Sequence, residues 1–395
     1  MTPALTVLFV CSNDIHVRTF APVARELQRG NAGSVFLSLD GLYHQGATNA
    51  ARSLGIEIED VGAPRAGRSA FYRRSAISVW SDVLRARTEI RTHLRAHPAS
   101  CLVVGNDRGL IERAWLHEAR SRGMRTILVQ DGQLFDQLPA PETFKGMAWR
   151  SSKGLASTLF RRVGLGSLAA SRYGEGGADV ICASGDDSAA LLARRAGHRS
   201  KVVVTGQPRY DDLPARDPSP ARWTGPVVFF TTPYAHAGLE DHAQERQEAL
   251  AVSLGAAFAS AGWRFLVKPH PREEAWRYEQ MIPNSATTRT TPDLIAEASA
   301  AIVGPSTVAE EAAIIGCPVI VPSFSPAGHA TSALLPNGNA YPRFRDASAA
   351  VTLVDRIASD AEWRQDLIAQ QRALVRRRVL TDGAAAPRVA EAIVG

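Results

Sequence analysis

The sequence has few of the features that mark disulfide-bonded, cysteine-ligated or membrane-spanning proteins. It holds only four cysteines in 395 residues, and no two of them form a CxxC pair. Each lies in or beside an apolar run, which is typical of buried free thiols in a reducing compartment and argues against a cysteine zinc site. No apolar run approaches the roughly 18 residues that span a bilayer.

The sequence also predicts neither a secretory leader nor a nucleic-acid-binding motif. No basic region precedes the apolar residues of Met1–Val10, which favours a first strand over a signal peptide and a cytoplasmic location over secretion. The formal net charge is +6, but the basic residues are spread along the sequence. They form no zinc finger, helix-turn-helix or aromatic and basic platform, so we expect no nucleic-acid partner.

Short apolar runs alternate with helical patterns along the whole chain. This alternation is typical of βα units and of a parallel sheet buried on both faces. The predicted strands are Thr6–Val10, Ser34–Leu39, Cys101–Val104, Thr126–Val129, Asp179–Cys182, Lys201–Thr205, Pro226–Thr232, Arg264–Val267, Ala300–Val303 and Pro318–Val321. The predicted helices include Phe20–Arg29, Ile77–Ala96, Leu110–Arg122, Gln244–Ala261, Thr291–Ala298 and 306–315.

The length and a proline-rich interruption predict two domains. A chain of 395 residues exceeds what one core usually serves, and four prolines lie between Gly206 and Pro226, where the alternating pattern resumes. We predict an α/β protein with two Rossmann-like parallel-sheet domains, residues 1–206 and 226–380, joined by a linker of residues 207–225. Residues 381–395 are expected to form a terminal helix that packs back on the first domain.

The segment from residue 304 to residue 322 carries the clearest functional pattern. Small and hydroxylated residues follow an apolar run, a short helical segment comes next, and a second apolar run follows Gly316. Strand, tight turn, helix and strand in this order leave the N–H groups of a helix N-terminus free to hold a phosphate. Ser306 and Thr307 would contact that phosphate or cap the helix, and the two uses are compatible.

One turn into the same helix lie two adjacent carboxylates, Glu310 and Glu311. One of them could accept hydrogen bonds from the hydroxyl groups of a ribose. Neighbouring helical residues point about 100° apart, so both cannot serve one ligand group. We expect Glu311 first and Glu310 second. The alternative is that either carboxylate only complements the helix N-terminus.

Three stretches resemble the GT-B glycosyltransferase superfamily. Glu310-Glu311-Ala312, followed three residues later by Gly316-Cys317-Pro318-Val319, resembles the late motif of the non-hydrolysing UDP-N-acetylglucosamine 2-epimerases and of many GT-B transferases. The stretch 203–211, Val-Val-Thr-Gly-Gln-Pro-Arg-Tyr-Asp, is similar to the interdomain segment of these epimerases and of Kdo transferases. Residues 266–273 are similar to a strand–loop motif of Kdo transferases and of CDP-glycerol glycerophosphotransferases.

The resemblance implies two Rossmann-like domains facing a cleft, with a nucleotide-sugar donor held mainly by the second. In those families an acidic residue five positions before the glycine holds the ribose, and here that residue is Glu311. The donor or nucleotide-binding residues that we expect are Gly206, Thr232, His236, Lys268, His270, Ser306, Thr307, Glu310 and Glu311. His270 lies between two prolines that fix its loop, and the alternative is a turn histidine that binds no ligand. For Lys268 the alternative is a solvated side chain at the end of a strand.

A base must take the proton of the acceptor hydroxyl, and it is expected in the first half. The loop after the first strand lies at a strand C-terminal end, where such sites form. His16 resembles the histidine that many GT-B transferases carry there, and Asp14 would be the base itself or orient His16. The alternative is a capping Asp14 with His16 on the first helical turn. Asp131, after the strand Thr126–Val129, is the competing base.

The resemblance implies a metal-independent glycosyltransferase of cell-envelope, capsular polysaccharide or glycoconjugate synthesis, with a glycan, glycolipid or other hydroxyl acceptor. Such enzymes stabilise the leaving phosphate with amides, helix N-termini and basic side chains, so no cofactor or metal is expected. The alternatives are a nucleotide-sugar 2-epimerase, a CDP-glycerol-type polyol-phosphate transferase, or a non-catalytic protein that binds glycan or nucleotide. The turn 231–238 is not the His-Arg-rich turn of the epimerases, which favours transfer.

Residues 144–173 combine basic and apolar side chains without an acidic residue. A basic amphipathic segment can lie on anionic lipid. Peripheral contact with the inner face of the cell membrane is therefore one hypothesis for this segment. An ordinary solvated helix with one packed face is the other, and the one that we favour slightly.

Overall fold

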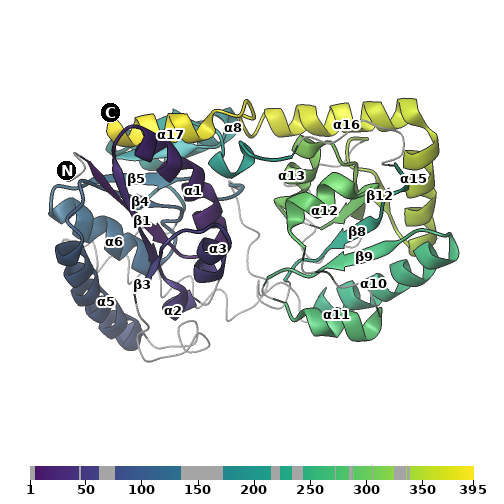
Figure 1. Cartoon of the computed structure of the whole chain (residues 1–395), viewed down its shortest axis with the longest axis horizontal. Coiled ribbons are helices and arrows are strands. Elements are labelled where there is room, and N and C mark those ends of the chain that lie inside the picture. The colour runs from purple at the N-terminus through teal and green to yellow at the C-terminus, as the bar shows by residue number, and fades with distance from the viewer. Residues whose placement is uncertain are drawn as a thin grey trace. The chain divides into compact units, whose positions relative to one another are not determined.

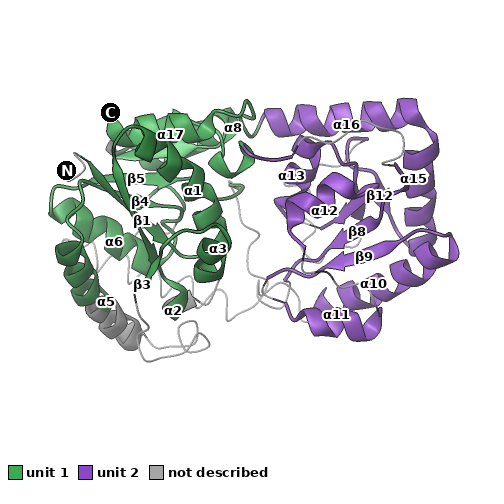
Figure 2. Ribbon diagram, viewed as in Figure 1, with its two compact units in different colours: residues 1–136, 140–211, 378–395 green, residues 137–139, 212–377 purple. Residues whose placement is uncertain are grey.

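A computed structural model describes residues 5–43, 46–61, 76–134, 172–214, 223–233, 243–271, 273–283, 287, 289–304, 306–323, 335 and 339–395, with residues 76–85 and 199 described by their backbone alone. The chain forms two compact units (Figure 2). Unit 1 contains residues 1–136, 140–211 and 378–395, and unit 2 contains residues 137–139 and 212–377. Each unit is built on a parallel sheet, as the sequence predicts.

Unit 1 has a seven-stranded sheet of order β3-β2-β1-β4-β5-β6-β7 (Figure 1). Its strands are β1 (Thr6–Cys11), β2 (Gly33–Ser38), β3 (Glu59–Asp60), β4 (Cys101–Val104), β5 (Arg125–Val129), β6 (Val180–Ala183) and β7 (Lys201–Val204). All neighbours are parallel. Six strands match the predicted ranges to within one residue at each end. The edge strand β3 was not predicted, because its two acidic residues have no apolar pattern.

Helices cover both faces of the unit 1 sheet. They are α1 (Asp14–Arg29), α2 (Asp40–Tyr43), α3 (Ala47–Ser53), α5 (Ala76–Ala96), α6 (Leu110–Ser121), α8 (Asp186–Ala196) and α17 (Ala385–Val394). Side chains of α5, α6 and α8 share one buried cluster with the sheet, and those of α1, α3 and α17 share the other. Strands covered on both faces explain the continuous apolar runs in the sequence.

The last helix, α17, belongs to unit 1. Its Val389 and Ile393 join the buried cluster that contains Phe20 of α1. The carboxylate of Asp211 accepts hydrogen bonds from the N–H groups of Ala385, at 3.1 Å, and Ala386, at 2.7 Å, at the start of the helix. Residues 207–211, the first part of the predicted linker, belong to unit 1, as do residues 378–395, and unit 2 ends at residue 377.

Unit 2 has a five-stranded sheet of order β12-β11-β10-β8-β9. Its strands are β8 (Val227–Phe230), β9 (Phe265–Lys268), β10 (Ala300–Val303), β11 (Val319–Pro322) and β12 (Arg343–Phe344). Its helices are α10 (Ala243–Ser260), α11 (Ala275–Met281), α12 (Thr291–Glu297), α13 (Val308–Ile315), α15 (Ala347–Ser359) and α16 (Ala361–Arg376). Phe229 of β8, Phe258 of α10 and Val354 of α15 lie in its core.

Each sheet reverses the direction of its connections beside its first strand. In unit 1 the chain builds β1, β2 and β3 outward and then returns to place β4 on the other side of β1. In unit 2 it builds β8 and β9 and then places β10 on the other side of β8. Ligands of open α/β sheets bind outside the carboxyl ends of the strands at such a switch point. The candidate sites are therefore the β1/β4 end of unit 1 and the β8/β10 end of unit 2.

The four cysteines are all buried and free, as the sequence predicts. Burial raises the pKa of Cys101 and Cys182 to about 12, so both remain thiols at neutral pH. None of the helices that the structure describes combines the length and apolar character that a membrane crossing requires.

Candidate functional site

The loop after β1 is shorter than predicted, because α1 begins at Asp14 and not at Phe20. Asn13 has extended backbone angles, and its side chain accepts a hydrogen bond from the N–H of His16 at 2.9 Å. Asn13 is therefore the N-cap, with Asp14 and His16 in the first turn of the helix. The signal was visible in the sequence as an asparagine followed directly by an aspartate.

His16 is fully buried, and both of its ring nitrogens make hydrogen bonds. The N–H of Ser12 donates to Nδ1 at 3.1 Å, so Nδ1 carries no proton. In the neutral ring the proton is then on Nε2, which donates to Oδ2 of Asp131 at 3.0 Å. Asp131, whose side chain is 22% exposed, is the member of the pair that reaches solvent.

Gly105, which follows β4, allows the imidazole to lie at the switch point. A Cβ atom on Gly105 would lie 2.5 Å from Cδ2 and Nε2 of His16, far inside van der Waals contact. The hydroxyl of Tyr173 donates to the carbonyl oxygens of Gly105, at 2.9 Å, and Val129, at 3.1 Å. The ends of β4 and β5 are thus tied together beside His16. Neither Gly105 nor Tyr173 was predicted, since neither role has a local sequence signal.

A buried pair fixes the other side of the same loop. The hydroxyl of Ser12 donates to Oε1 of Glu112 in α6 at 2.7 Å, and both side chains are buried. This bond fixes the residue whose N–H sets the tautomer of His16. Glu112 was not predicted either, because a helical glutamate ordinarily faces solvent.

Asp107 links the end of β4 to a loop near Tyr173. Its buried carboxylate accepts hydrogen bonds from the N–H groups of Gly174, at 2.9 Å, and Gly176, at 2.7 Å. Burial raises its pKa to about 6, and these hydrogen bonds only partly oppose that shift. Asp107 thus holds the segment that carries Tyr173.

The turn that carries Asp131 is fixed by Gln130. Its side-chain oxygen accepts from the N–H of Ser184 at 3.0 Å, and its amide donates to the carbonyl of Gly132 at 2.7 Å and to Ser188 at 3.1 Å. With its amide oxygen and nitrogen committed in this way, Gln130 supports the turn, and Asp131 presents its carboxylate from it.

Asp14 does not bind the ring of His16, because the two ring nitrogens are hydrogen-bonded to Ser12 and Asp131. The carboxylate of Asp14 lies 4.0 Å from the guanidinium of Arg18, one turn along α1. Burial raises the pKa of Asp14, and the charges of Arg18 and Arg209 partly offset the shift. Asp131 is therefore the carboxylate that orients His16.

In unit 2 the predicted phosphate-binding turn lies at the end of β10, at the start of α13. Thr307 occupies the N-cap position, and its side chain makes no capping hydrogen bond. Ser306 accepts from the N–H of Val308 at 3.3 Å. Glu310 is buried, with 5% of its surface exposed, whereas Glu311 is half-buried. Glu311 is therefore the more accessible of the two carboxylates.

The end of β8 lies across the switch point from this turn. The backbone of Thr232 is held by the buried Gln247 of α10, which accepts from its N–H at 2.8 Å and donates to its carbonyl at 3.1 Å. The buried hydroxyl of Thr232 has no hydrogen-bond partner among the residues that the structure describes. A buried hydroxyl at a strand end calls for a partner such as a ligand oxygen.

The loop after β9 is held by Glu273, whose side chain accepts a hydrogen bond from Thr231. Thr231 in turn accepts from the N–H of His270 at 2.8 Å. The ammonium of Lys268 donates to the carbonyl of Thr287 at 3.4 Å. The strand order therefore brings Thr232, Lys268, His270, Ser306 and Thr307 to the carboxyl ends of three adjacent strands, β9, β8 and β10.

The predicted donor residue Gly206 has a structural role in unit 1. Gly206 follows β7, the edge strand of unit 1, with a φ of +86°. A Cβ atom there would lie 2.7 Å from the carbonyl oxygen of Leu380, so Gly206 allows the segment before α17 to pack closely. His236 lies outside the described residues, and so does the predicted membrane-contacting segment 144–173 apart from its last two residues.

Comparison with solved structures identifies the architecture. The chain superposes on UDP-GlcNAc 2-epimerase from Neisseria meningitidis, bound to UDP-GlcNAc, with a TM-score of 0.62 at 14% identity, over 99% of this chain and 100% of that one. MurG from Acinetobacter baumannii gives a TM-score of 0.54 at 14% identity, over 99% of both chains. The chain has the GT-B fold.

A third GT-B relative is a UDP-glucosyltransferase from Polygonum tinctorium that is capable of glucosylating indoxyl. It gives a TM-score of 0.59 at 13% identity, with 100% of both chains covered. No protein-family model and no curated protein sequence matches the chain. The GT-B fold binds nucleotide sugars and is mostly a fold of enzymes, and glycosyltransferases and 2-epimerases share it.

Proposed function

We propose that this GT-B chain is a glycosyltransferase that moves a sugar from a nucleotide-activated donor to a hydroxyl group of a glycan, glycolipid or other acceptor. Cell-envelope polysaccharide, capsular polysaccharide or glycoconjugate synthesis is the setting that the sequence resemblance implies. The observation that carries the proposal is the buried pair at the switch point of unit 1, in which His16 holds Asp131. A fixed, partly exposed carboxylate at that place suits the activation of a hydroxyl group.

Asp131 is the proposed base and His16 the residue that positions it. A base needs a lone pair that the acceptor proton can reach. Nδ1 of His16 already accepts from Ser12, Nε2 carries a proton, and the ring is fully buried. Asp131 uses Oδ2 for His16 and remains partly exposed. The acceptor hydroxyl would donate its proton to this carboxylate as its oxygen attacks.

The donor would be held by unit 2. We assign the leaving phosphate to the N-terminus of α13 and to the hydroxyls of Ser306, Thr307 and Thr232, with His270 and Lys268 beside them. Two observations support this assignment. The buried hydroxyl of Thr232 has no hydrogen-bond partner among the described residues, and the side chain of Thr307 makes no capping hydrogen bond. Glu311, more accessible than the buried Glu310, is the proposed ribose ligand.

The reaction balances without a further reactant. The acceptor oxygen forms a bond to the anomeric carbon, and the bond from that carbon to the donor phosphate oxygen breaks. The leaving nucleotide keeps the electron pair, and Asp131 takes the proton. Amide N–H groups and hydroxyls at a helix N-terminus can stabilise the charge that develops on the phosphate, so we expect transfer to need no metal.

The competing function is 2-epimerisation of a nucleotide sugar. Inverting a carbon next to the anomeric centre removes a proton on one face and returns one on the other, which calls for more than one acid–base group. Next to Asp131, the amide of Gln130 is neutral and committed to support of the turn. Gln130 therefore supplies no second acid–base group beside Asp131, and this favours transfer over epimerisation.

A nucleotide screen followed by product analysis tests the proposed function. UDP, CDP, CMP, GDP and TDP and their sugars would be compared by thermal shift, starting with UDP because the epimerase relative was solved with UDP-GlcNAc. With an acceptor mixture we expect free nucleotide and a glycosylated acceptor in equal amounts. An isomerised nucleotide sugar without acceptor would establish the epimerase. Nucleotide binding with no turnover in any acceptor mixture would favour a non-catalytic binding protein.

Replacing Glu311 by alanine is expected to weaken nucleotide binding by about 1–3 kcal/mol, the cost of losing hydrogen bonds to a charged partner. Calorimetry with the best nucleotide from the screen measures the change. Glu297→Ala is the matched control, because Glu297 is an exposed helical glutamate of unit 2 paired with Arg289 at 2.6 Å. Equal affinities for the parent chain and Glu311→Ala would remove Glu311 from the site.

The proposed location is the cytoplasm, at the inner face of the cell membrane where lipid-linked acceptors are found. Co-sedimentation with vesicles tests this part. Binding that increases with the fraction of anionic lipid supports it, and equal sedimentation with and without such vesicles contradicts it.

A further inference from the structure

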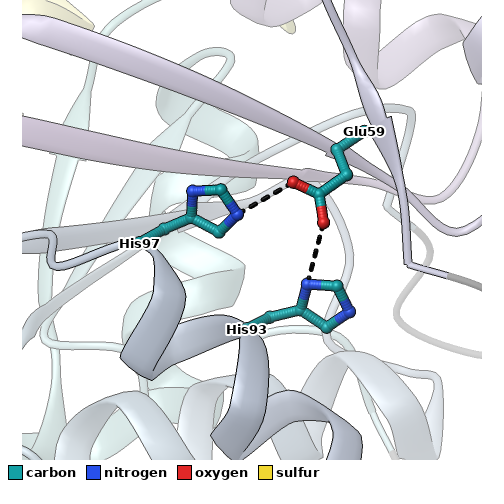
Figure 3. A group of neighbouring side chains, drawn as sticks. All are labelled: Glu59, His93 and His97. Atoms are coloured by element: carbon teal, nitrogen blue, oxygen red, sulfur yellow. Dashed lines mark hydrogen bonds and ion pairs between the residues drawn. The ribbon is translucent and has the colours of Figure 1, made fainter.

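Two histidines and a glutamate converge at the edge of the unit 1 sheet, away from the proposed base (Figure 3). Nδ1 of His93 lies 3.1 Å from Oε1 of Glu59, and Nε2 of His97 lies 2.8 Å from Oε2 of the same carboxylate. His93 lies in the last turn of α5, and Glu59 comes from β3. His97 directly follows Ala96, the last residue of α5, and its N–H donates to the carbonyl of His93 at 2.9 Å. All three side chains are partly exposed, so an ion from solvent can reach them.

The three groups have the spacing of a metal site. Residues four apart on a helix lie on one face, and the two imidazole rings are almost parallel, at 5°, with centroids 6.4 Å apart. The ligand atoms of the three residues all lie within 4.8 Å of one another. Ligands about 2.0–2.2 Å from a tetrahedral zinc ion lie roughly 3.2–3.6 Å from each other, so small side-chain movements suffice.

A cavity borders the cluster. It has a volume of about 640 Å³, and both Glu59 and His97 line it, together with residues of β2 and α3. Three protein ligands leave one tetrahedral position for a water molecule, and the cavity supplies room for it. The ligand set, two imidazoles and one carboxylate, is typical of zinc and related divalent transition metals.

We propose that Glu59, His93 and His97 bind a divalent transition-metal ion of the zinc class, which clamps the edge strand β3 to α5. β3 has only two residues, and among the strands that the structure describes it pairs only with β2, through Leu37–Glu59 and Ser38–Asp60. A metal bridge would add a strong link where the sheet is weakest. Four strand spacings separate β3 from β5, about 19 Å, so this ion lies outside the proposed reaction site.

The alternative is that the cluster is complete without a metal, as two hydrogen bonds from imidazoles to one carboxylate. The two arrangements respond differently to acid. Metal binding needs the imidazole lone pairs and is lost when acid protonates them. The ion pairs between the carboxylate and the imidazoles, by contrast, become stronger when the imidazoles are protonated. If the cluster is complete without a metal, the chain should bind no zinc through these residues at neutral pH.

The experiment is a zinc titration of the full chain after treatment with a chelator, followed by calorimetry and thermal shift. We expect one ion per chain and a higher melting temperature with zinc. His93→Ala and His97→Ala should each weaken zinc binding by about 100-fold or more, since even outer-shell changes cost about 10–100-fold. His198→Ala is the matched control, because His198 is exposed and far from the cluster in sequence, and it should bind zinc like the parent chain.

Cobalt provides a second readout that separates loss of binding from loss of folding. Visible absorption of bound Co²⁺ should appear with the parent chain and with His198→Ala, and be absent with His97→Ala. The circular dichroism spectra without metal should be the same for all three chains. If an alanine variant unfolds, Glu59→Gln, which keeps the shape of the side chain, takes its place in the metal titration. A structural zinc site would be filled at about 100 μM zinc, so the proposal is overturned if the parent chain binds no zinc at that concentration. Equal binding by the histidine variants overturns it as well.

Discussion

Replacing Asp131 by asparagine is expected to lower kcat/KM for sugar transfer by about 100-fold or more, because a positioned base contributes about 10²–10⁴-fold. Nucleotide affinity should be unchanged, since the proposed donor residues lie in unit 2. The substitution tests chemistry more than structure. An asparagine oxygen can still accept the hydrogen bond that Nε2 of His16 donates at 3.0 Å, so the buried pair survives while the carboxylate is lost.

His16→Ala is the informative partner of this variant. It removes the residue that orients the carboxylate and leaves the carboxylate itself, so we expect a smaller loss of turnover than Asp131→Asn causes. Steady-state kinetics with the donor identified by the nucleotide screen gives both values. If His16→Ala is inactive while Asp131→Asn keeps most of the activity, the histidine is the base and the tautomer argument fails.

Replacing Gly105 by alanine is expected to reduce turnover by about 100-fold, the cost of misplacing a catalytic group by about 1 Å. The new Cβ atom would lie 2.5 Å from two atoms of the His16 ring, closer than Cβ atoms approach other groups. The ring is buried and bonded on both sides, so it cannot turn away without breaking its bond to Ser12 or to Asp131. The loss should appear in kcat, with nucleotide binding retained.

Gly30→Ala is the control for a glycine change near the same helix. Gly30 follows the C-terminal end of α1, its φ is −83°, and a Cβ atom there makes ordinary contacts, the nearest at 3.4 Å. We expect parental turnover from this variant. A Gly105→Ala chain that melts at the parental temperature and transfers sugar at the parental rate would show that the position of His16 is not needed.

The sequence predicted the sheets well and their edges poorly. Central strands such as β1 and β4 are continuous apolar runs because helices cover both faces, so their patterns stand out. β3 consists of Glu59 and Asp60, and its place is set by pairing with β2 across the sheet, which no local pattern reports. The start of α1 was predicted too late, at Phe20, although Asn13 and Asp14 supply a capping signal at its true start.

The candidate site was predicted by residue type and not by arrangement. His16 and Asp131 were each expected at strand ends, and both ends do meet at one edge of unit 1. Their direct bond, across 115 positions of sequence, follows from the strand order β1-β4-β5 and from the space left by Gly105. The cluster of Glu59, His93 and His97 was missed for the same reason. The two histidines lie at the C-terminal end of α5, four positions apart, but Glu59 reaches them only once the sheet has formed.

The position of α17 has a consequence for the order of events during synthesis. Its buried side chains complete one face of unit 1, and Asp211 binds the first N–H groups of the helix. On the ribosome these residues emerge only after all of unit 2 has been made. Until then unit 1 has the cover that α1 and α3 provide on that face but lacks the part that α17 provides. A chaperone that protects apolar surface would therefore act on the half of the chain that was made earlier.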